Sequence, residues 1–354
     1  MNENVFYDGT KLLSMKDING KIPEVYLCTS NRNAGKTTYF NRLMVNRWLK
    51  RQEKFCLIYR FSYELDNVAD KFFKDIGGLF FKDYYFESNK EMRGMYTSLW
   101  LNDENCGYAI ALNTADNIKK ISHVFSDVKN MEFDEFQSET GHYCADEAKK
   151  FISVHTSIAR GQGEQVRFVP VYMISNNVTL LNPYYTLLGI GARINSNTKF
   201  LRGDGFVLEN GFNESASKQQ LESGFNRAFA KSSYVAYAAQ NVYLNDNTAF
   251  IERPKGVNRY ICTIRYKGTE FGIREFTNES IMYVDKSPDI TSKYRFVATT
   301  DDHNVDYVML MRNSFFFSQL RTLFEQGSFR FYDIECKDML INVLAYSLQL
   351  RGTS

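Results

Sequence analysis

A short polar loop, residues 30–38, carries the residue types that bind phosphate groups. In a loop of the pattern GxxxxGK[ST], backbone N–H groups surround the phosphates, the lysine contacts the β- and γ-phosphates, and the hydroxyl binds Mg²⁺. Gly35, Lys36 and Thr37 match the second half of this pattern, whereas Ser30 replaces its first glycine. An apolar strand precedes the loop and a long helix follows it, which is the context that the motif requires. The sequence therefore predicts a site for ATP and Mg²⁺ formed by Ser30, Asn31, Arg32, Asn33, Ala34, Gly35, Lys36, Thr37 and Thr38.

Two adjacent carboxylates, Asp134 and Glu135, follow a predicted strand that ends at residues 131–133. An aspartate at such a strand end holds Mg²⁺, and a glutamate directly after it polarises the attacking water as a general base. We therefore predict that Asp134 and Thr37 bind the metal. Lys36 and Glu135 are the predicted catalytic residues. The adjacent glutamate is typical of the ASCE branch of P-loop NTPases, which contains motors, helicases and AAA-type ATPases.

Three further polar positions fit the same chemistry. The next predicted strand ends in Ser175 and Asn176, and either side chain can sense the γ-phosphate from there. Arg32 adds a cation inside the loop, either to contact the γ-phosphate or to face solvent. Arg160 is a candidate arginine finger, delivered to a neighbouring subunit to stabilise charge on the transferring phosphoryl group. A solvated helix end is the alternative interpretation of Arg160.

The elements that must position these residues alternate between strands and helices. The predicted strands are residues 24–28, 54–61, 107–112, 131–133 and 166–175. Strands separated by helical stretches indicate a largely parallel sheet with helices on both faces. We therefore predict an α/β domain of the P-loop NTPase class over residues 1–197.

The pattern changes after residue 197. Residues 198–246 are polar and rich in small residues, and they predict short helices in a linker or lid subdomain. Residues 247–354 predict a smaller α+β domain. Its predicted elements are an antiparallel meander of strands 259–267, 270–276 and 280–285, with a turn at Gly268-Thr269, and helices at 314–326 and 337–350.

Composition limits the class of protein. Of 354 residues, 44% are hydrophobic and 24% charged, as in a soluble globular protein. The net charge of +2 does not by itself indicate a nucleic-acid partner, so any basic surface must be local. The cysteines form no CxxC pair and the histidines show no zinc-ligand spacing, which favours free thiols in a reducing cytoplasm. No apolar run of about 18 residues occurs, so we expect neither a membrane span nor secretion.

Several segments, taken in order, resemble a known family. Residues 4–14, 30–38, 133–136 and 175–185 together are similar to the DNA packaging ATPase, or DNA encapsidation protein, of small Picovirinae-type podoviruses. The order and spacing of the segments carry the resemblance. Ser30 and Asn33 stand where that family tends to have glycine. The similarity continues more weakly through residues 267–272, 280–289, 299–302 and 327–333.

The resemblance implies a homomeric ring motor, with a pentamer as the implied form. It would move double-stranded DNA in the host cytoplasm while transiently bound to the viral portal and procapsid, and a structural packaging RNA is a further partner left open. Arg32 would be the family's P-loop arginine and Arg160 its trans-acting finger. Residues 247–354 would be an RNase H-like nuclease fold without its metal-binding carboxylates. The residues agree, since a two-metal nuclease needs an acidic residue on its first strand and 259–267 has none.

Lys119 and Lys120, in the loop region before the strand that ends at 131–133, are the candidate DNA contacts. Lysines that neutralise phosphates suit sequence-independent binding to DNA. A solvated basic loop is an equally favoured interpretation of the same residues.

Two other functions stay open from the residues alone. One is a terminase-like enzyme with an active nuclease, and the other is a non-hydrolysing nucleic-acid-binding protein with a degenerate P-loop. The prediction of an ATP site rests on the residues themselves. The ring and the DNA partner rest on the resemblance.

Overall fold

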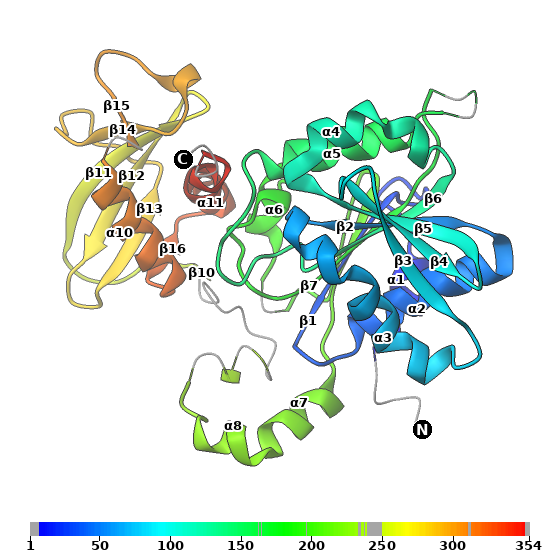
Figure 1. The fold of residues 1–354 in the computed structure, drawn as a ribbon. Coiled ribbons are helices and arrows are strands. Elements are labelled where there is room, and N and C mark those ends of the chain that lie inside the picture. Colours follow the sequence, from blue (N-terminus) through cyan, green and yellow to red (C-terminus); the bar gives the residue numbers. More distant parts are fainter. Residues whose placement is uncertain are drawn as a thin grey trace. The chain divides into compact units, whose positions relative to one another are not determined.

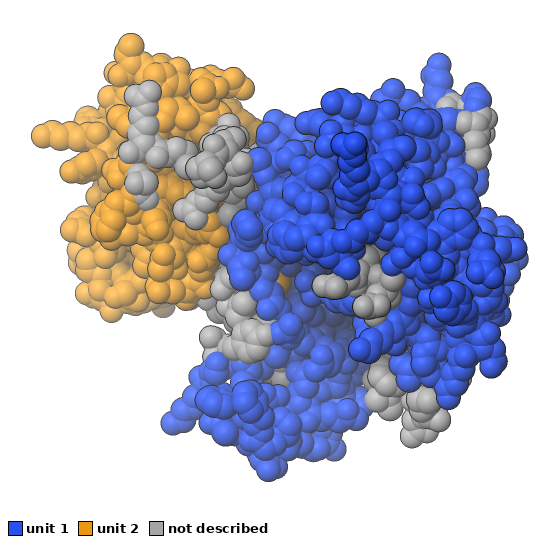
Figure 2. Space-filling view, viewed as in Figure 1, with its two compact units in different colours: residues 1–177, 198–242 blue, residues 178–197, 243–354 orange. Residues whose placement is uncertain are grey.

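The computed structural model describes residues 7–161, 163, 165–195, 197–232, 235–236, 238, 250–310 and 313–350, with the backbone alone at 67–70, 250, 314 and 346–350. The chain divides into two compact units, coloured separately in Figure 2. Unit 1 comprises residues 1–177 with 198–242, and unit 2 comprises residues 178–197 with 243–354. The domains 1–197, 198–246 and 247–354 stay a prediction, although compactness places most of 198–246 in unit 1. No helix in the described ranges is long and apolar enough to span a membrane.

Unit 1 is built on a nine-stranded sheet in the order β3-β4-β5-β2-β6-β7-β1-β9-β8. The run from β5 to β9 is parallel throughout, and antiparallel pairs occur only towards the two edges. This arrangement confirms the predicted α/β fold with a largely parallel sheet. The strands are β1 (Val25–Ser30), β2 (Lys54–Tyr59), β3 (Phe86–Glu91), β4 (Tyr96–Leu101), β5 (Glu104–Ala111), β6 (Val128–Asp134), β7 (Val171–Asn176), β8 (Phe200–Gly203) and β9 (Phe206–Asn210).

Helices cover both faces of this sheet, as predicted. Figure 1 shows α2 and α3 on one face and α4 and α5 on the other. In α2 the apolar side chains of Phe40, Met44 and Trp48 recur every four residues, so one stripe of the helix is buried against the sheet. The helices of unit 1 are α1 (Thr10–Ser14), α2 (Lys36–Arg51), α3 (Val68–Phe80), α4 (Ala115–Lys120), α5 (Glu147–Ile158), α7 (Glu214–Glu222) and α8 (Gly224–Ala228), with 3-10 turns at Ser62–Asn67, Leu112–Thr114 and Ser122–Phe125.

The strand order brings three strand ends together. β7 lies between β1 and β6, so the phosphate-binding loop and the carboxylate pair are one strand apart. Ser30 at the end of β1 is in register with Asn176 at the end of β7, and Asp134 of β6 is in register with Ile174. Because carboxyl ends of parallel strands share one edge of a sheet, this edge holds the phosphate-binding loop, Asp134 and Asn176.

One part of unit 1 departs from the prediction. Residues 214–228 form the short helices α7 and α8, but residues 200–210 form a β-hairpin whose strand β9 pairs in parallel with β1. The turn is Asp204-Gly205, with a left-handed Gly205, and the apolar run at 206–208 supplies the buried strand. Asp-Gly before an apolar run is a hairpin signal that the polar character of the surrounding residues obscured.

Unit 2 contains a seven-stranded sheet in the order β10-β16-β13-β12-β11-β14-β15. Its central meander β11-β12-β13 is antiparallel, as predicted. Its strands are β10 (Phe250–Ile251), β11 (Asn258–Tyr266), β12 (Thr269–Phe276), β13 (Ile281–Asp285), β14 (Arg295–Val297), β15 (Val308–Met309) and β16 (Phe329–Phe331). Its helices are α6 (Pro183–Leu188), α10 (Ser314–Glu325) and α11 (Ile334–Leu350), with 3-10 turns at Gly191–Arg193 and Thr300–Asp302.

The hairpin turn between β11 and β12 lies one residue earlier than predicted. Lys267 and Gly268, at φ 50° and 78°, form the turn, and Thr269 already belongs to β12. The carboxylate of Asp302 accepts from the N–H groups of both turn residues, each at 2.7 Å. Asp302 therefore stabilises a left-handed conformation at Lys267 that the sequence of the hairpin alone does not indicate.

Candidate active site

The phosphate-binding loop connects β1 to α2. Two of its residues are left-handed, Asn33 at φ 58° and Gly35 at φ 90°, and glycine and asparagine tolerate this conformation best. Gly35 is the N-cap of α2, so the unpaired N–H groups of the first helical turn face the loop. Lys36, Thr37 and Thr38 occupy that turn.

The ammonium group of Lys36 is held inside the loop. Its Nζ donates to Ser30 Oγ at 2.9 Å, to the Asn31 carbonyl at 3.1 Å and to Asn176 Oδ1 at 3.2 Å. Burial lowers the pKa of Lys36 to about 8, an effect that Cys28 and Asp134 oppose. Ser30 thus gives the lysine a hydroxyl acceptor that the glycine of the usual pattern lacks.

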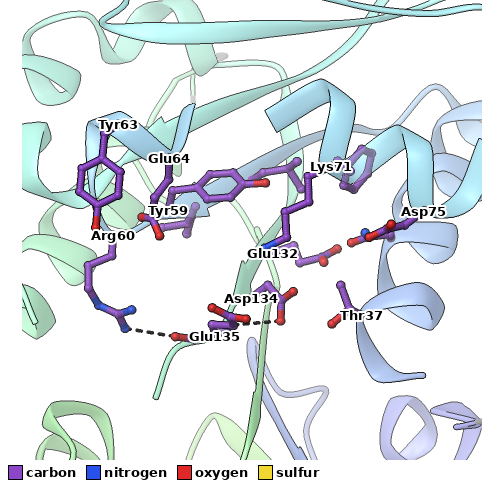
Figure 3. A pocket seen from close by; sticks show the side chains of 14 residues that line it. Thr37, Tyr59, Arg60, Tyr63, Glu64, Lys71, Asp75, Glu132, Asp134 and Glu135 are labelled. Carbon is purple, nitrogen blue, oxygen red and sulfur yellow. Dashed lines mark hydrogen bonds between the residues drawn. The ribbon is translucent and has the colours of Figure 1, made fainter. Parts of the chain in front are cut away.

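Asp134 and Thr37, the two predicted metal ligands, line the same cavity at the carboxyl ends of the strands. Thr37 lies near the Asp134 carboxylate, and both side chains are labelled in Figure 3. Burial, together with the neighbouring Glu135, raises the pKa of Asp134 to about 6, while Lys71 and Thr37 pull it down. Both side chains line a cavity of about 290 Å³ between α2, α3 and the strand ends, drawn in Figure 3.

This oxygen pair suits Mg²⁺. A hydroxyl and a carboxylate are the hard ligands that Mg²⁺ prefers, and in NTPase sites the ion takes only one or two protein ligands beside phosphates and water. Within the described ranges no group of three or more His, Cys, Asp or Glu residues is arranged to hold a metal. Thr37 and Asp134 therefore fit a nucleotide-bound ion rather than a closed structural metal site.

Glu135 adopts an unusual backbone conformation. Its φ is 55°, a left-handed value that costs energy for a residue with a side chain. Its N–H donates to Asp134 Oδ1 at 2.9 Å, and its carbonyl accepts from Arg60 at 3.2 Å. The Glu135 side chain is exposed at the cavity, where it can reach a water molecule. Figure 3 shows Glu135 beside Asp134, with its backbone bonded to Arg60 and to the Asp134 carboxylate.

Arg60 was not among the predicted site residues. It directly follows β2 and forms an ion pair with Glu147 of α5 at 2.8 Å. The same guanidinium donates to the Phe136 carbonyl at 3.0 Å and lies over the Tyr143 ring. A charged residue at the end of the apolar run 54–61 was the available signal, because that end shares the sheet edge with Asp134.

Glu132 is a second residue that the sequence did not single out. It lies two residues before Asp134 in β6, hence on the same face of the sheet, and it lines the same cavity. Only 2% of Glu132 is exposed, and among the described residues its Oε2 has no hydrogen-bond partner. Burial raises the pKa of Glu132 well above its ordinary value.

Of the two candidate sensor residues, Asn176 contacts Lys36 directly. Ser175 instead donates from its hydroxyl to the Asn176 carbonyl at 2.7 Å. Arg32, the extra cation of the loop, forms an ion pair with Glu139 at 3.5 Å. The roles of these residues towards a γ-phosphate stay predictions.

Arg160 and the two candidate DNA contacts lie away from this site. Arg160 follows α5, and the adjacent Gly161 packs near Ser126, just before the start of β6, whereas Asp134 ends that strand. Lys119 and Lys120 lie in the last turn of α4, not in a loop as predicted. That short helix forms because its apolar side is buried, and Lys119 pairs with Asp116 at 2.6 Å along it.

Comparison with known proteins places this chain in a family. A family model described as podovirus DNA encapsidation protein (Gp16) matches residues 1–347. The DNA packaging protein of Bacillus phage PZA is 24% identical over 352 residues, 98% of each chain. The DNA packaging protein of Bacillus phage B103 is 23% identical over 304 residues, 85% of this chain and 90% of the relative.

Two solved structures share the fold along the whole chain. A chain of the bacteriophage Phi-29 viral genome packaging motor assembly matches with a TM-score of 0.60 at 24% identity, covering 99% of this chain and 100% of that one. The Phi-28 gp11 DNA packaging motor matches with a TM-score of 0.58 at 17% identity over 98% of each chain. The predicted resemblance is thereby confirmed, and the protein belongs to the podovirus DNA encapsidation protein family.

Proposed function

We propose that this protein is an ATP-hydrolysing motor subunit that drives double-stranded viral DNA into a procapsid. It would act as part of a homomeric ring, a pentamer, in the host cytoplasm while bound to the viral portal. Membership of the DNA encapsidation family supports the packaging role. The observation that carries the ATPase role is that Thr37, Asp134 and the exposed Glu135 line one cavity, with Lys36 close enough to Asp134 for their charges to interact.

Phosphate binding would fall to the loop and to Lys36. The contacts of the Lys36 ammonium with Ser30 and the Asn31 carbonyl can be exchanged for phosphate oxygens, which carry more negative charge. A nearby phosphate also favours the charged form of the lysine and so opposes the effect of burial on its pKa. The N–H groups that follow Gly35 supply further donors to the same phosphates.

Thr37 and Asp134 would hold Mg²⁺ between them. When bound, Mg²⁺ supplies neutralisation of the charge on the phosphate oxygens. Asp134 must be ionised for this role, and Thr37 would offer its hydroxyl oxygen to the ion. The raised pKa of Asp134 suits a carboxylate whose main positive partner would be the Mg²⁺ that arrives with nucleotide.

Glu135 would accept a proton from the attacking water. Its carboxylate is exposed at the cavity, and Arg60 fixes its backbone. Asn176 contacts Lys36 and would thereby respond to the γ-phosphate. Arg160 would act on the site of a neighbouring subunit, which is consistent with its place at the opposite end of β6 from Asp134.

DNA contact is proposed for Lys119 and Lys120 at the end of α4. Lys120 is exposed there, and lysines at a helix end can neutralise backbone phosphates without reading sequence. A packaging RNA is a further possible partner that no residue argues for. We propose no nuclease role for residues 247–354, because β11 carries no acidic residue to begin a two-metal site.

A packaging assay tests this function. Purified procapsids, viral DNA and ATP are mixed with the wild-type protein or with Lys36→Ala, and DNA protected from nuclease is measured. We expect protected DNA with the wild type and none with Lys36→Ala. Equal protection by both proteins would contradict the proposal, as would hydrolysis of ATP without any protected DNA.

A further inference from the structure

The helix α7 is bonded to the phosphate-binding loop at two successive residues. Asn31 and Asn213 exchange hydrogen bonds: Asn31 Nδ2 donates to the Asn213 carbonyl at 3.1 Å, and the Asn213 N–H donates to Asn31 Oδ1 at 3.0 Å. One residue further along the loop, Gln220 Nε2 donates to the Arg32 carbonyl at 2.8 Å. All of these residues belong to unit 1.

These bonds act on the part of the loop that holds Lys36. The carbonyl of Asn31 accepts from Lys36 Nζ at 3.1 Å, so the orientation of the Asn31 backbone sets one of the contacts of the ammonium. Asn31 is 1% exposed, and its side-chain amide is engaged with Asn213 instead of water. Loss of the contacts from α7 would therefore make the segment that starts at Ser30 more mobile. The usual motif has a more flexible glycine at the position of Ser30.

The segment that carries α7 is itself fixed to the sheet. Strand β9 pairs with β1, and the Gly211 N–H donates to the Thr29 carbonyl at 2.8 Å. Asn213 then caps α7, since its Oδ1 accepts from the Ala216 N–H at 2.9 Å. The start of α7 is thus bonded at once to the loop and to its own first turn.

The contact of Gln220 with the Arg32 carbonyl is not needed to form the helix α7 itself. The Gln220 Oε1 is buried, and no described residue donates to it. A buried acceptor without a partner destabilises a fold. We therefore attribute the position of the Gln220 amide to its Nε2 donor, which bonds the Arg32 carbonyl. Its neighbour Gln219 is exposed on the same helix.

We propose that Gln220, together with Asn213, is a positioning residue for the phosphate-binding loop. The two residues set the backbone of Asn31 and Arg32, and through it the contacts of Lys36, before nucleotide arrives. This inference rests on the proposed ATP site. Because coupling between two sites is reciprocal, a nucleotide on the loop also stabilises α7 through the same bonds.

The test compares Gln220→Leu with the control Gln219→Leu in binding of a fluorescent ADP analogue to the full chain. Loss of one hydrogen bond that preorganises the loop predicts a Kd about three- to tenfold higher for Gln220→Leu, with Gln219→Leu unchanged. The leucine also removes the unpartnered Oε1, so we expect the melting temperatures of both variants to stay close to that of the wild type.

Hydrogen exchange gives a readout that a merely structural role would not move. ADP should slow exchange in residues 214–222 of the wild type and of Gln219→Leu, and this protection should be lost in Gln220→Leu. If Gln220→Leu does not fold, Gln220→Glu keeps the length and removes the donor, and the same changes are expected.

Equal Kd values for the position-219 and position-220 variants, or tighter binding by the latter, would overturn this inference. Lys36→Ala in the same assay separates it from the proposed function. If Lys36→Ala binds ADP like the wild type, the ATP site itself is wrong. If Lys36→Ala loses binding and Gln220→Leu does not, only the positioning role fails.

Discussion

Arg60 forms an ion pair with Glu147 at 2.8 Å in the interior of unit 1, where their side chains are 8% and 0% exposed. The same guanidinium donates to the carbonyl of Glu135, the proposed general base. A buried pair thus fixes the backbone of the residue whose exposed carboxylate we propose as the general base. Its integrity can be tested separately from nucleotide binding.

Removing one partner of this pair should destabilise the fold strongly. In Glu147→Gln, Arg60 keeps a buried charge without its counter-ion, and we expect the free energy of unfolding to fall by about 3–5 kcal/mol. The double variant Arg60→Met/Glu147→Leu should recover a large part of that loss. Urea denaturation measures both, and a Glu147→Gln protein as stable as the wild type would contradict the buried pair.

Gly35 should not tolerate a side chain. Its φ of 90° is left-handed, and alanine there costs about 1–2 kcal/mol while moving the N-cap of α2. Gly35→Ala should therefore weaken ATP binding as well as lower stability. Gly78→Ala is the control, because this helical glycine has open space at the Cβ position. Isothermal titration of both variants with ATP is the measurement, and unchanged affinity of Gly35→Ala would count against the loop geometry.

Arg160 should act between subunits. Rings of Arg160→Ala or of Glu135→Gln should each be inactive, but a mixture forms sites with an intact Glu135 from one subunit and an intact Arg160 from the next. We expect ATP hydrolysis to reappear on mixing. A mixture of Lys36→Ala with Glu135→Gln is the control, since both changes affect the subunit's own site. Absence of recovery in the first mixture would remove Arg160 from the mechanism.

Stability should depend on pH through Glu209. Burial raises the pKa of Glu209, and Tyr7 donates to its Oε2 at 2.6 Å. Between the ordinary pKa of glutamate and this raised value the folded state binds more protons than the unfolded state, so stability from this residue falls as pH rises through that window.

Glu209→Gln removes the titrating group and keeps an acceptor for Tyr7. The variant should therefore gain stability relative to the wild type as pH rises from 4 to 7. Thermal melting across this pH range measures the difference. A constant difference between Glu209→Gln and the wild type would show that Glu209 does not titrate in this way.

The sequence alone predicts those parts of the site that a single continuous segment of the chain forms. The loop around Lys36 combines a motif with its own strand and helix, and Asp134 ends a recognisable strand. The register of β7 between β1 and β6 then brings Asn176 to Lys36. The contact between Asn176 and Lys36 follows from this strand order.

Other contacts depend on packing between distant segments, and the sequence did not reveal them. Arg60 reaches Glu147 and Glu135 only because β2 lies beside β6, which no local pattern fixes. Gln220 reaches Arg32 only because an unpredicted hairpin places β9 against β1. The sequence predicts a loop at Lys119 because a helix as short as α4 has too few residues to show a helical pattern.

ATP hydrolysis by the Glu135→Gln protein tests the central claim most directly. Steady-state hydrolysis is measured with procapsids and duplex DNA, beside wild type and Lys36→Ala, and ATP binding is measured on the same samples. The site described here predicts that Glu135→Gln binds ATP but hydrolyses it about 10²- to 10⁴-fold more slowly, and that Lys36→Ala loses binding. Wild-type turnover by Glu135→Gln would contradict the assignment of this site.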